Sequence, residues 1–365
     1  MPSAIAHLHD FGQSPWYDNL ARPLLTGGGL RQLVTEDGIR GVTSNPTIFE
    51  KAMAAGAGYD EQLKQTAAEG LSIADSYWRL VVDDVGNAAD VLRAVYDETG
   101  GADGFVSVEV SPDLAHESAE THAQAKDLFA RLDRPNVMIK IPATVEGLPA
   151  ITETVAAGIN VNVTLIFSLE RHDAVIEAYL SGLERLVASG GDPSRVSSVA
   201  SFFVSRVDTE TDRRLPEGHE LRGRAAVANA KLAYRLFRQR FAGERWDALA
   251  AKGARLQRPL WASTSTKNPA YSPTLYVDDL IGRDTVNTLA PASIEALHQG
   301  DTNLRADTVE QDVDGAERDL AGLAGAGVDF DDVTATLERE GVDSFSASFS
   351  DALGTIEKRR SELTS

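Results

Sequence analysis

Short runs rich in β-branched residues alternate along this chain with longer amphipathic segments, and this alternation limits most strongly what the chain can fold into. The order is typical of repeated β-α units, because parallel neighbouring strands need a crossover that is usually a helix. The runs that resemble strands are Ile39–Ser44, Phe105–Val110, Asn136–Ile141, Asn160–Phe167, Val196–Val204, Pro259–Thr264 and Thr285–Leu289, with the shorter Ser14–Asp18 as an eighth. Eight units predict an α/β fold, a (β/α)8 TIM barrel with extra helices, whereas seven could equally form an open sheet.

Two stretches go beyond the simple repeat. Residues 46–104 contain helical periodicity between two strands, for example in Asp75–Val95, and predict a helical insertion. Residues 308–365 predict a helical C-terminal extension, whose acidic start we interpret as a solvated helix face. No linker, composition break or internal repeat interrupts the 365 residues, so we expect a single barrel domain over residues 1–365.

Composition excludes several classes of function. The chain has no cysteine, which removes disulfides, thiolate nucleophiles and cysteine-ligated metals. Its 35 Lys and Arg against 55 Asp and Glu give a formal charge of -20, which disfavours nucleic acid as a partner. Met1–Asp10 has no basic region before an apolar one, and no apolar run has the length of a membrane helix. We therefore expect a cytoplasmic protein that does not bind membranes, as a monomer or a homodimer.

Charged side chains interrupt two strands that should be apolar on both faces. Strands of a parallel barrel are covered by helices outside and filled by side chains inside. Lys140 is the one charge in Asn136–Ile141, and burial is the condition under which a lysine becomes a neutral nucleophile. Glu109 is likewise the one charged residue in Phe105–Val110. It could act as a general acid or base, or serve only as a counter-ion for Lys140.

A strict polar alternation marks the next strand. Asn160, Asn162 and Thr164 share one face, with aliphatic residues on the other. Because a parallel barrel has no solvent-facing side, these groups predict a polar interior. Hydroxyls that share one parity, and so one expected face of the strand, recur in two later runs, each followed by a cation, where they suit an anionic group such as a phosphate. These residues are Ser201, Ser205 and Arg206 in the first, and Ser263, Ser265 and Lys267 in the second.

Two other motifs carry less information. Gly27, Gly28 and Gly29 lack the surrounding pattern of a phosphate-binding loop, so a flexible loop is the preferred interpretation. His7 and His9 form the H-x-H pair that holds a metal in some barrel hydrolases, but no strand precedes them. We therefore predict no metal site.

Several segments together resemble the transaldolase family. They occur in the family's order and are specific as a set. The segments are Gly41–Glu50 (GVTSNPTIFE), Val106–Pro112 (VSVEVSP), Val137–Thr144 (VMIKIPAT), Ile159–Ser168 (INVNVTLIFS), Ser201–Arg206 (SFFVSR) and Pro259–Lys267 (PLWASTSTK). The resemblance implies a class I aldolase barrel without a metal or organic cofactor. It also implies transfer of a dihydroxyacetone unit between sugar phosphates in the non-oxidative pentose phosphate pathway.

Carried over position by position, the resemblance makes Lys140 the Schiff-base lysine. Asp18 corresponds to the aspartate that moves the proton of the C4 hydroxyl. Glu109 and Thr164 correspond to the pair that manages the catalytic water. By the same resemblance the residues that bind substrate are Asn45, Asn162 and Ser201 for the dihydroxyacetone hydroxyls, Arg206 for phosphate, and Ser263, Ser265 and Lys267 near a later phosphate site.

The chain departs from the family at that later site. Shorter members have a Ser-Phe-Arg run where this chain has Ser265-Thr266-Lys267, and lysine lacks the bidentate fork of arginine. The nearest rival function is a fructose 6-phosphate aldolase, which would release free dihydroxyacetone. Phe203 resembles the transaldolase residue where that aldolase has a tyrosine. A catalytically silent sugar-phosphate binder and a metal hydrolase are the alternatives from other classes.

Overall fold

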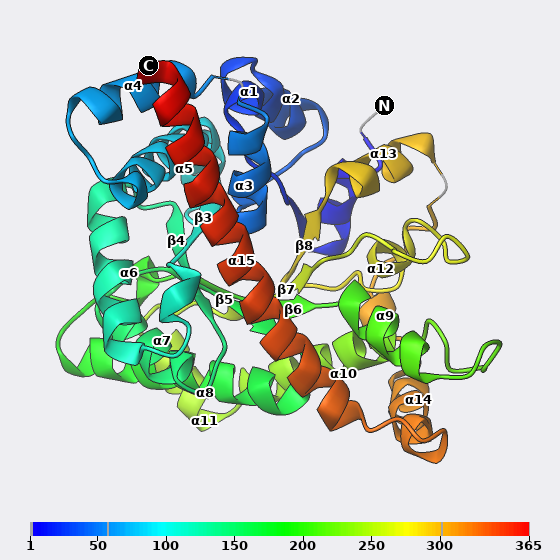
Figure 1. Cartoon of the computed structure of the whole chain (residues 1–365). Helices are drawn as coiled ribbons and strands as arrows, with labels where there is room; N and C mark the ends of the chain where they lie inside the picture. The colour runs from blue at the N-terminus through cyan, green and yellow to red at the C-terminus, as the bar shows by residue number, and fades with distance from the viewer. Residues whose placement is uncertain (1–2, 57, 301, 365) are drawn as a thin grey trace.

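Eight parallel strands close into a barrel in the computed structural model of the chain, which describes residues 3–56, 58–300 and 302–364 (Figure 1). The strands are β1 (Gln13–Tyr17), β2 (Gly41–Thr43), β3 (Phe105–Glu109), β4 (Val137–Pro142), β5 (Val161–Ile166), β6 (Ser198–Phe203), β7 (Gln257–Ala262) and β8 (Thr285–Leu289). β1 pairs with β8 from Gln13↔Thr285 to Tyr17↔Leu289, and this pairing closes the ring. The predicted (β/α)8 barrel is thus confirmed, and the open-sheet alternative is wrong.

Helices surround the barrel, and additional ones elaborate it. Those that follow the strands are α1 (Arg22–Thr26), α2 (Gly29–Glu36), α6 (Ser118–Leu132), α7 (Gly147–Ala156), α8 (Leu169–Ala188), α9 (Ser205–Arg214), α10 (Ala225–Arg240), α11 (Glu244–Ala250), α12 (Leu275–Asp278) and α13 (Pro291–Gln299). Between β2 and β3 lie α3 (Pro46–Ala54), α4 (Asp60–Ala68) and α5 (Ile73–Glu98). Short 3-10 helices are η1 (Ala6–Phe11), η2 (Pro112–Leu114), η3 (Pro193–Arg195) and η4 (Thr308–Glu310). None of the helices in the described ranges is both long and apolar enough to cross a membrane.

Two strands have irregular backbone at the ends that their residue patterns predict to be regular. In β5 the backbone of Leu165 has φ +60°, and the register with β6 shifts between Val163 and Ile166. In β7 the last strand residue is Ala262, and Ser263 has φ +56°. A positive φ ends regular alternation, because the next side chain no longer projects to the expected face. Both irregularities lie at the carboxyl ends of strands, where barrel enzymes build their active sites.

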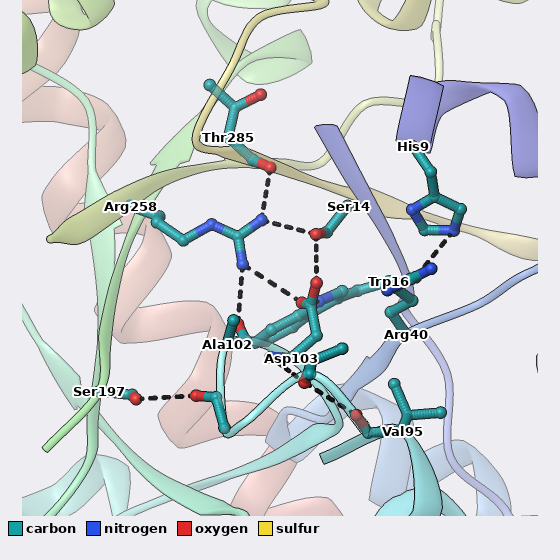
Figure 2. Close-up of polar contacts among 12 residues, drawn as sticks. His9, Ser14, Trp16, Arg40, Val95, Ala102, Asp103, Ser197, Arg258 and Thr285 are labelled. Carbon is teal, nitrogen blue, oxygen red and sulfur yellow. Dashed lines mark hydrogen bonds and ion pairs between the residues drawn. The ribbon is translucent and has the colours of Figure 1, made fainter. Parts of the chain in front are cut away.

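A polar network closes the opposite, amino-terminal end of the barrel (Figure 2). The Arg258 guanidinium donates to Ser14 Oγ at 2.6 Å and to the Thr285 carbonyl oxygen at 2.8 Å, and it lies 3.2 Å from Asp103 Oδ1. Asp103 also accepts hydrogen bonds from Ser14 Oγ at 2.5 Å and Trp16 Nε1 at 2.9 Å. These contacts join β1, β7, β8 and the residues before β3. This end of a barrel contributes to stability, so the network fixes the scaffold beneath the site.

The C-terminal extension forms two helices with different neighbours. α14 (Val313–Gly325) packs on α10, where Arg224 Nε lies 3.0 Å from Asp319 Oδ2 and Arg235 Nη2 lies 2.5 Å from Glu317 Oε1. The expected solvated acidic face is therefore partly wrong, because arginines of α10 pair with it. α15 (Phe330–Thr364) is the long red helix that crosses the front of the barrel in Figure 1, in contact with α3, α4, α5 and α9.

His172 is a titratable group enclosed in the apolar shell behind β6. Neither ring nitrogen has a hydrogen-bond partner within the described structure, and the ring meets Phe202 edge-on at 5.6 Å between centroids. Burial lowers the pKa of His172 from 6.5 to about 4. The unfolded chain therefore takes up this proton at higher pH than the folded chain. The resulting stability is fully present above about pH 6.5 and is lost as the pH falls toward 4.

We predict that His172→Leu removes this part of the pH dependence of stability. Between pH 7 and pH 5 the wild-type free energy of unfolding should fall by roughly 2 kcal/mol more than that of the variant. Urea unfolding at the two pH values measures the difference. The exposed His7 offers a matched control, His7→Leu, which should behave as wild type. Equal slopes for wild type and His172→Leu would contradict the assignment.

Candidate active site

A cavity lies among the carboxyl ends of the strands. Most of its lining comes from strand ends and the residues that directly follow them. The lining residues are Asp18, Thr43, Asn45, Lys140, Thr164, Ser201, Phe203, Arg206, Leu260, Ala262, Ser263, Thr288 and Phe345. Seven of the eleven residues singled out from the sequence therefore line this cavity, and they come from segments far apart along the chain. Glu109 and Asn162 lie next to it, in contact with the lining residues Lys140 and Ser201.

Lys140 and Glu109 form a buried ion pair at the floor of the cavity. Their strands pair so that the two residues are direct neighbours, and Lys140 Nζ lies 3.2 Å from Glu109 Oε2. Nζ also donates to the Ser44 carbonyl oxygen at 3.1 Å. The side chains are only 6% and 4% exposed, so water does little to screen the pair. Burial raises the pKa of Glu109, while the adjacent Lys140 opposes that rise. A carboxylate with a raised pKa is a better acceptor for a proton from the lysine.

Thr164 offers a free hydroxyl beside this pair. It lies two residues after Asn162, whose strand position pairs with Lys140, and both side chains point to the barrel interior as the alternation predicted. Thr164 Oγ1 is buried and has no hydrogen-bond partner in the described part of the chain. Buried hydroxyls without a partner are rare. The Thr164 hydroxyl is therefore available to a water molecule or a substrate.

Asp18 reaches the same cavity from the end of β1. Its Oδ1 accepts a hydrogen bond from Thr43 Oγ1 at 2.7 Å, and its backbone N–H donates to the Leu289 carbonyl oxygen at 2.9 Å. Burial raises the pKa of Asp18, while the Thr43 hydrogen bond and the charges of Lys140 and Lys267 lower it. A carboxyl group balanced in this way can take up and return a proton.

Amides and hydroxyls cover another side of the cavity. Asn45 caps α3, where its Oδ1 accepts from the Ile48 N–H at 2.9 Å, which leaves its amide N–H groups for a ligand. Asn162 Nδ2 donates to Ser107 Oγ at 2.9 Å, and Ser201 Oγ donates to Asn162 Oδ1 at 2.7 Å. This chain of hydrogen bonds fixes the direction of the Asn162 amide. Asn160, by contrast, lies before β5 and bonds to backbone carbonyls at the other end of the strand.

Arg206 supplies positive charge at the rim of the cavity. It lies in the first turn of α9, with its guanidinium 5.6 Å from the Phe203 ring centroid. Within the described residues it has neither a hydrogen bond nor an ion pair. Burial lowers the pKa of Arg206, and Glu340 of α15 opposes that effect. A half-buried arginine without a charged partner is suited to bind an anionic group.

The other predicted phosphate residues divide between cavity and loop. Ser263 lines the cavity, and its hydroxyl lies 2.9 Å from Ser205 Oγ, which joins the end of β7 to the start of α9. Ser265 and Lys267 lie in the following loop and are not among the described cavity-lining residues. The charge of the exposed Lys267 nevertheless acts on Asp18. The predicted common parity of Ser263 and Ser265 is wrong, because β7 ends before them.

Several lining residues were not found from the sequence. The lining residue Thr43 bonds to Asp18, and the adjacent Ser44, which is not among the lining residues, bonds to Lys140 through its carbonyl oxygen. The signal for both was the polar end of the Ile39–Ser44 run. Thr288 stands in the last strand, where it also donates to the Trp261 carbonyl oxygen at 3.0 Å. Phe345 comes from α15 and lies 205 residues after Lys140 along the chain. Its only sequence signal was an apolar spacing of four with Gly341 and Phe349.

The histidine pair does not form a shared site. His7 Nδ1 lies 3.0 Å from Asp10 Oδ2, whereas His9 Nε2 lies 2.7 Å from the Gly38 carbonyl oxygen. In the described ranges no group of three or more His, Asp or Glu side chains is arranged to hold a metal ion.

Fold and cavity together define a (β/α)8-barrel enzyme with a buried lysine as its candidate nucleophile. Residues 15–356 match the family described as Transaldolase/Fructose-6-phosphate aldolase. A protein named Transaldolase from Saccharopolyspora erythraea is 50% identical over 360 residues, which is 98% of both chains. Those from Frankia alni and Thermobifida fusca are each 49% identical over 361 residues, with 98% of this chain and 97% and 98% of the relatives covered. The chain belongs to the transaldolase/fructose-6-phosphate aldolase family.

We predict that Thr43→Val raises the pKa of Asp18. The substitution removes a hydrogen bond that favours the charged carboxylate, so an upward shift of the Asp18 pKa is expected. A titration of the Asp18 carboxyl carbon by NMR measures it. Thr43→Ser keeps the hydroxyl and should leave the pKa near that of the wild type. An unchanged pKa in Thr43→Val would show that Thr43 does not set the proton affinity of Asp18.

Proposed function

We propose that this chain is a transaldolase. It moves a dihydroxyacetone unit from sedoheptulose 7-phosphate or fructose 6-phosphate to glyceraldehyde 3-phosphate or erythrose 4-phosphate, within the non-oxidative pentose phosphate pathway. The observation that carries the proposal is the 3.2 Å contact of Lys140 and Glu109 inside a polar cavity that also contains a partner-free Arg206. Family membership and relatives of about 50% identity over nearly the whole chain support it.

The first step is formation of a Schiff base on Lys140. Glu109 takes a proton from the ammonium group, and the neutral amine adds to the C2 carbonyl of the ketose. The carbinolamine then loses its hydroxyl as water, with the proton supplied by Glu109. The unpartnered Thr164 hydroxyl holds this water next to the carboxyl group. The product is an iminium ion.

Cleavage of the C3–C4 bond follows. Asp18 accepts the proton of the C4 hydroxyl, a carbonyl forms at C4, and the electrons of the broken bond move into the iminium ion. The result is a neutral enamine and a free aldose phosphate. Asn45, Asn162 and Ser201 hold the hydroxyls of the remaining three carbons. Attack of the enamine on a second aldose phosphate reverses these steps, and hydrolysis of the imine then frees the new ketose phosphate. No metal or organic cofactor is needed, because the iminium ion serves as the electron sink.

Phosphate binding directs the substrates. Arg206 contacts the phosphate group, and Ser263, Ser265 and Lys267 approach it from the loop after β7. The net charge of -20 repels a sugar phosphate at long range, but screening limits that field to about 8 Å at physiological salt. The cationic side chains close to the bound phosphate group, Arg206 and Lys267, therefore determine how tightly it binds. The proposal includes a cytoplasmic location, because phosphorylated sugars do not diffuse across membranes.

The first experiment is trapping of the covalent intermediate. The protein is incubated with fructose 6-phosphate and borohydride, and its intact mass and peptide map are determined. A stable three-carbon adduct on Lys140 is the expected result. Addition of erythrose 4-phosphate then separates the two activities of the family, because a transaldolase forms sedoheptulose 7-phosphate whereas an aldolase continues to release dihydroxyacetone. A folded protein that binds the substrate without forming an adduct would favour the silent binder.

Arg206→Ala should raise the KM for fructose 6-phosphate with a smaller change in kcat. Loss of a charged hydrogen-bond donor to phosphate corresponds to about 1.5–3 kcal/mol, or roughly a 10- to 150-fold effect. Steady-state kinetics measures both constants. Arg213→Ala is the matched control, since the exposed Arg213 of the same helix pairs with Glu210. An unchanged KM in Arg206→Ala would refute the phosphate assignment.

A further inference from the structure

Phe345 forms the roof of the cavity directly above the lysine. It is 4% exposed, it lines the cavity, and its ring centroid lies 5.8 Å from Lys140 Nζ. All other lining residues belong to the barrel strands or the segments that follow them, whereas Phe345 comes from the helix that crosses the barrel (Figure 1). The ring therefore separates the reacting nitrogen from the solvent above the barrel.

Contacts one turn away on either side fix the position of this ring. Residues four apart lie on the same face of a helix. At Gly341 a Cβ atom would lie 2.9 Å from Leu165 Cδ2, so the absence of a side chain lets α15 approach the end of β5 closely. Phe349 meets the Tyr77 ring edge-on at 5.0 Å between centroids and is tilted against Trp78 at 6.2 Å. Phe345 is held between a close backbone approach and an aromatic cluster.

Ion pairs fasten both halves of α15. Before Phe345, Glu338 lies 3.3 Å from Arg171 of α8, and Asp332 lies 2.6 Å from Arg214 of α9. After it, Arg359 forms two hydrogen bonds to the Asp60 carboxylate of α4, at 2.9 and 2.8 Å. The helix is thus attached on both sides of the barrel opening, and the position of α15 over the cavity does not depend on the contacts of Phe345 alone.

Because the roof covers the lysine, it also covers any three-carbon enamine held there. The enamine has two possible fates. In transfer, its nucleophilic carbon forms a bond to the aldehyde carbon of the acceptor, whose oxygen takes a proton. In hydrolysis, the same carbon takes a proton, water adds to C2 of the resulting iminium ion, and the Lys140 amine leaves as free dihydroxyacetone is released.

We propose that Phe345 is a specificity-determining residue that favours transfer over hydrolysis by keeping bulk water from the enamine on Lys140. This inference rests on the proposed function. An apolar ring provides no hydrogen bond for water, so ordered water is confined to the polar side of the cavity, at Glu109 and Thr164. When the nitrogen is a protonated imine, the same ring lies within the distance of a cation–π contact. An acceptor that displaces this confined water then reacts first.

The test compares Phe345→Leu with Phe330→Leu, the same change at a half-buried position at the start of α15. Each variant receives fructose 6-phosphate and erythrose 4-phosphate, and free dihydroxyacetone is measured against sedoheptulose 7-phosphate. Phe345→Leu should raise the ratio of hydrolysis to transfer at least tenfold, with Phe330→Leu at the wild-type ratio. Phe345→Met, whose flexible side chain adapts to an irregular gap, keeps the test available if the leucine variant does not fold, and should also raise the ratio.

Borohydride trapping is performed on every variant to separate the two proposals. An adduct on Lys140 in all of them, with the same ratio in Phe345→Leu and Phe345→Met as in wild type, overturns the role of Phe345. An equal rise in Phe330→Leu overturns it as well, because loosening of α15 would then be the cause. Absence of the adduct in the wild type instead refutes the proposed function itself.

Discussion

Lys140 and Glu109 place opposite charges 3.2 Å apart inside a barrel, with almost no contact with water. Removing two charges from water is costly, and close pairing with further hydrogen bonds is what offsets the cost. The Ser44 carbonyl oxygen provides one such bond to the lysine. The carboxylate form of Glu109 is less well stabilised, because burial raises the pKa of Glu109 despite the adjacent lysine. Burial therefore opposes the charged form of the Glu109 carboxyl group and favours transfer of a proton to it from a neighbouring donor.

The fold was predictable because each strand carries its own local signal. Alternating runs such as Asn160–Phe167 gave the positions of all eight strands, and the charges of Lys140 and Glu109 stood out because their neighbours are aliphatic. Irregular backbone was not predictable in the same way. The positive φ values of Leu165 and Ser263 arise where β5 and β7 meet their following loops, and neither residue type favours that conformation. The parity expected for Ser263 and Ser265 failed for this reason.

Contacts between segments far apart in the chain were a second feature that the sequence did not predict. The acidic start of the extension was expected to face water, since nothing in its own sequence indicates that α10 supplies Arg224 and Arg235. Phe345 was missed because α15 is mostly polar, and its few apolar positions acquire a meaning only when the helix lies across the barrel. The strands thus predict the floor of the site, whereas tertiary packing alone defines its roof.

The roof also bears on how an acidic protein can act on phosphates. Coulomb attraction strengthens as water is excluded, so a few cations in a covered cavity outweigh many exposed carboxylates. Arg206 lies at the edge of the covered region, where burial lowers its pKa and Glu340 of α15 opposes that shift. The same helix that covers Lys140 thus places a negative charge near the arginine. In the proposed function, the negative charge of Glu340 therefore weakens the attraction of Arg206 for a phosphate group.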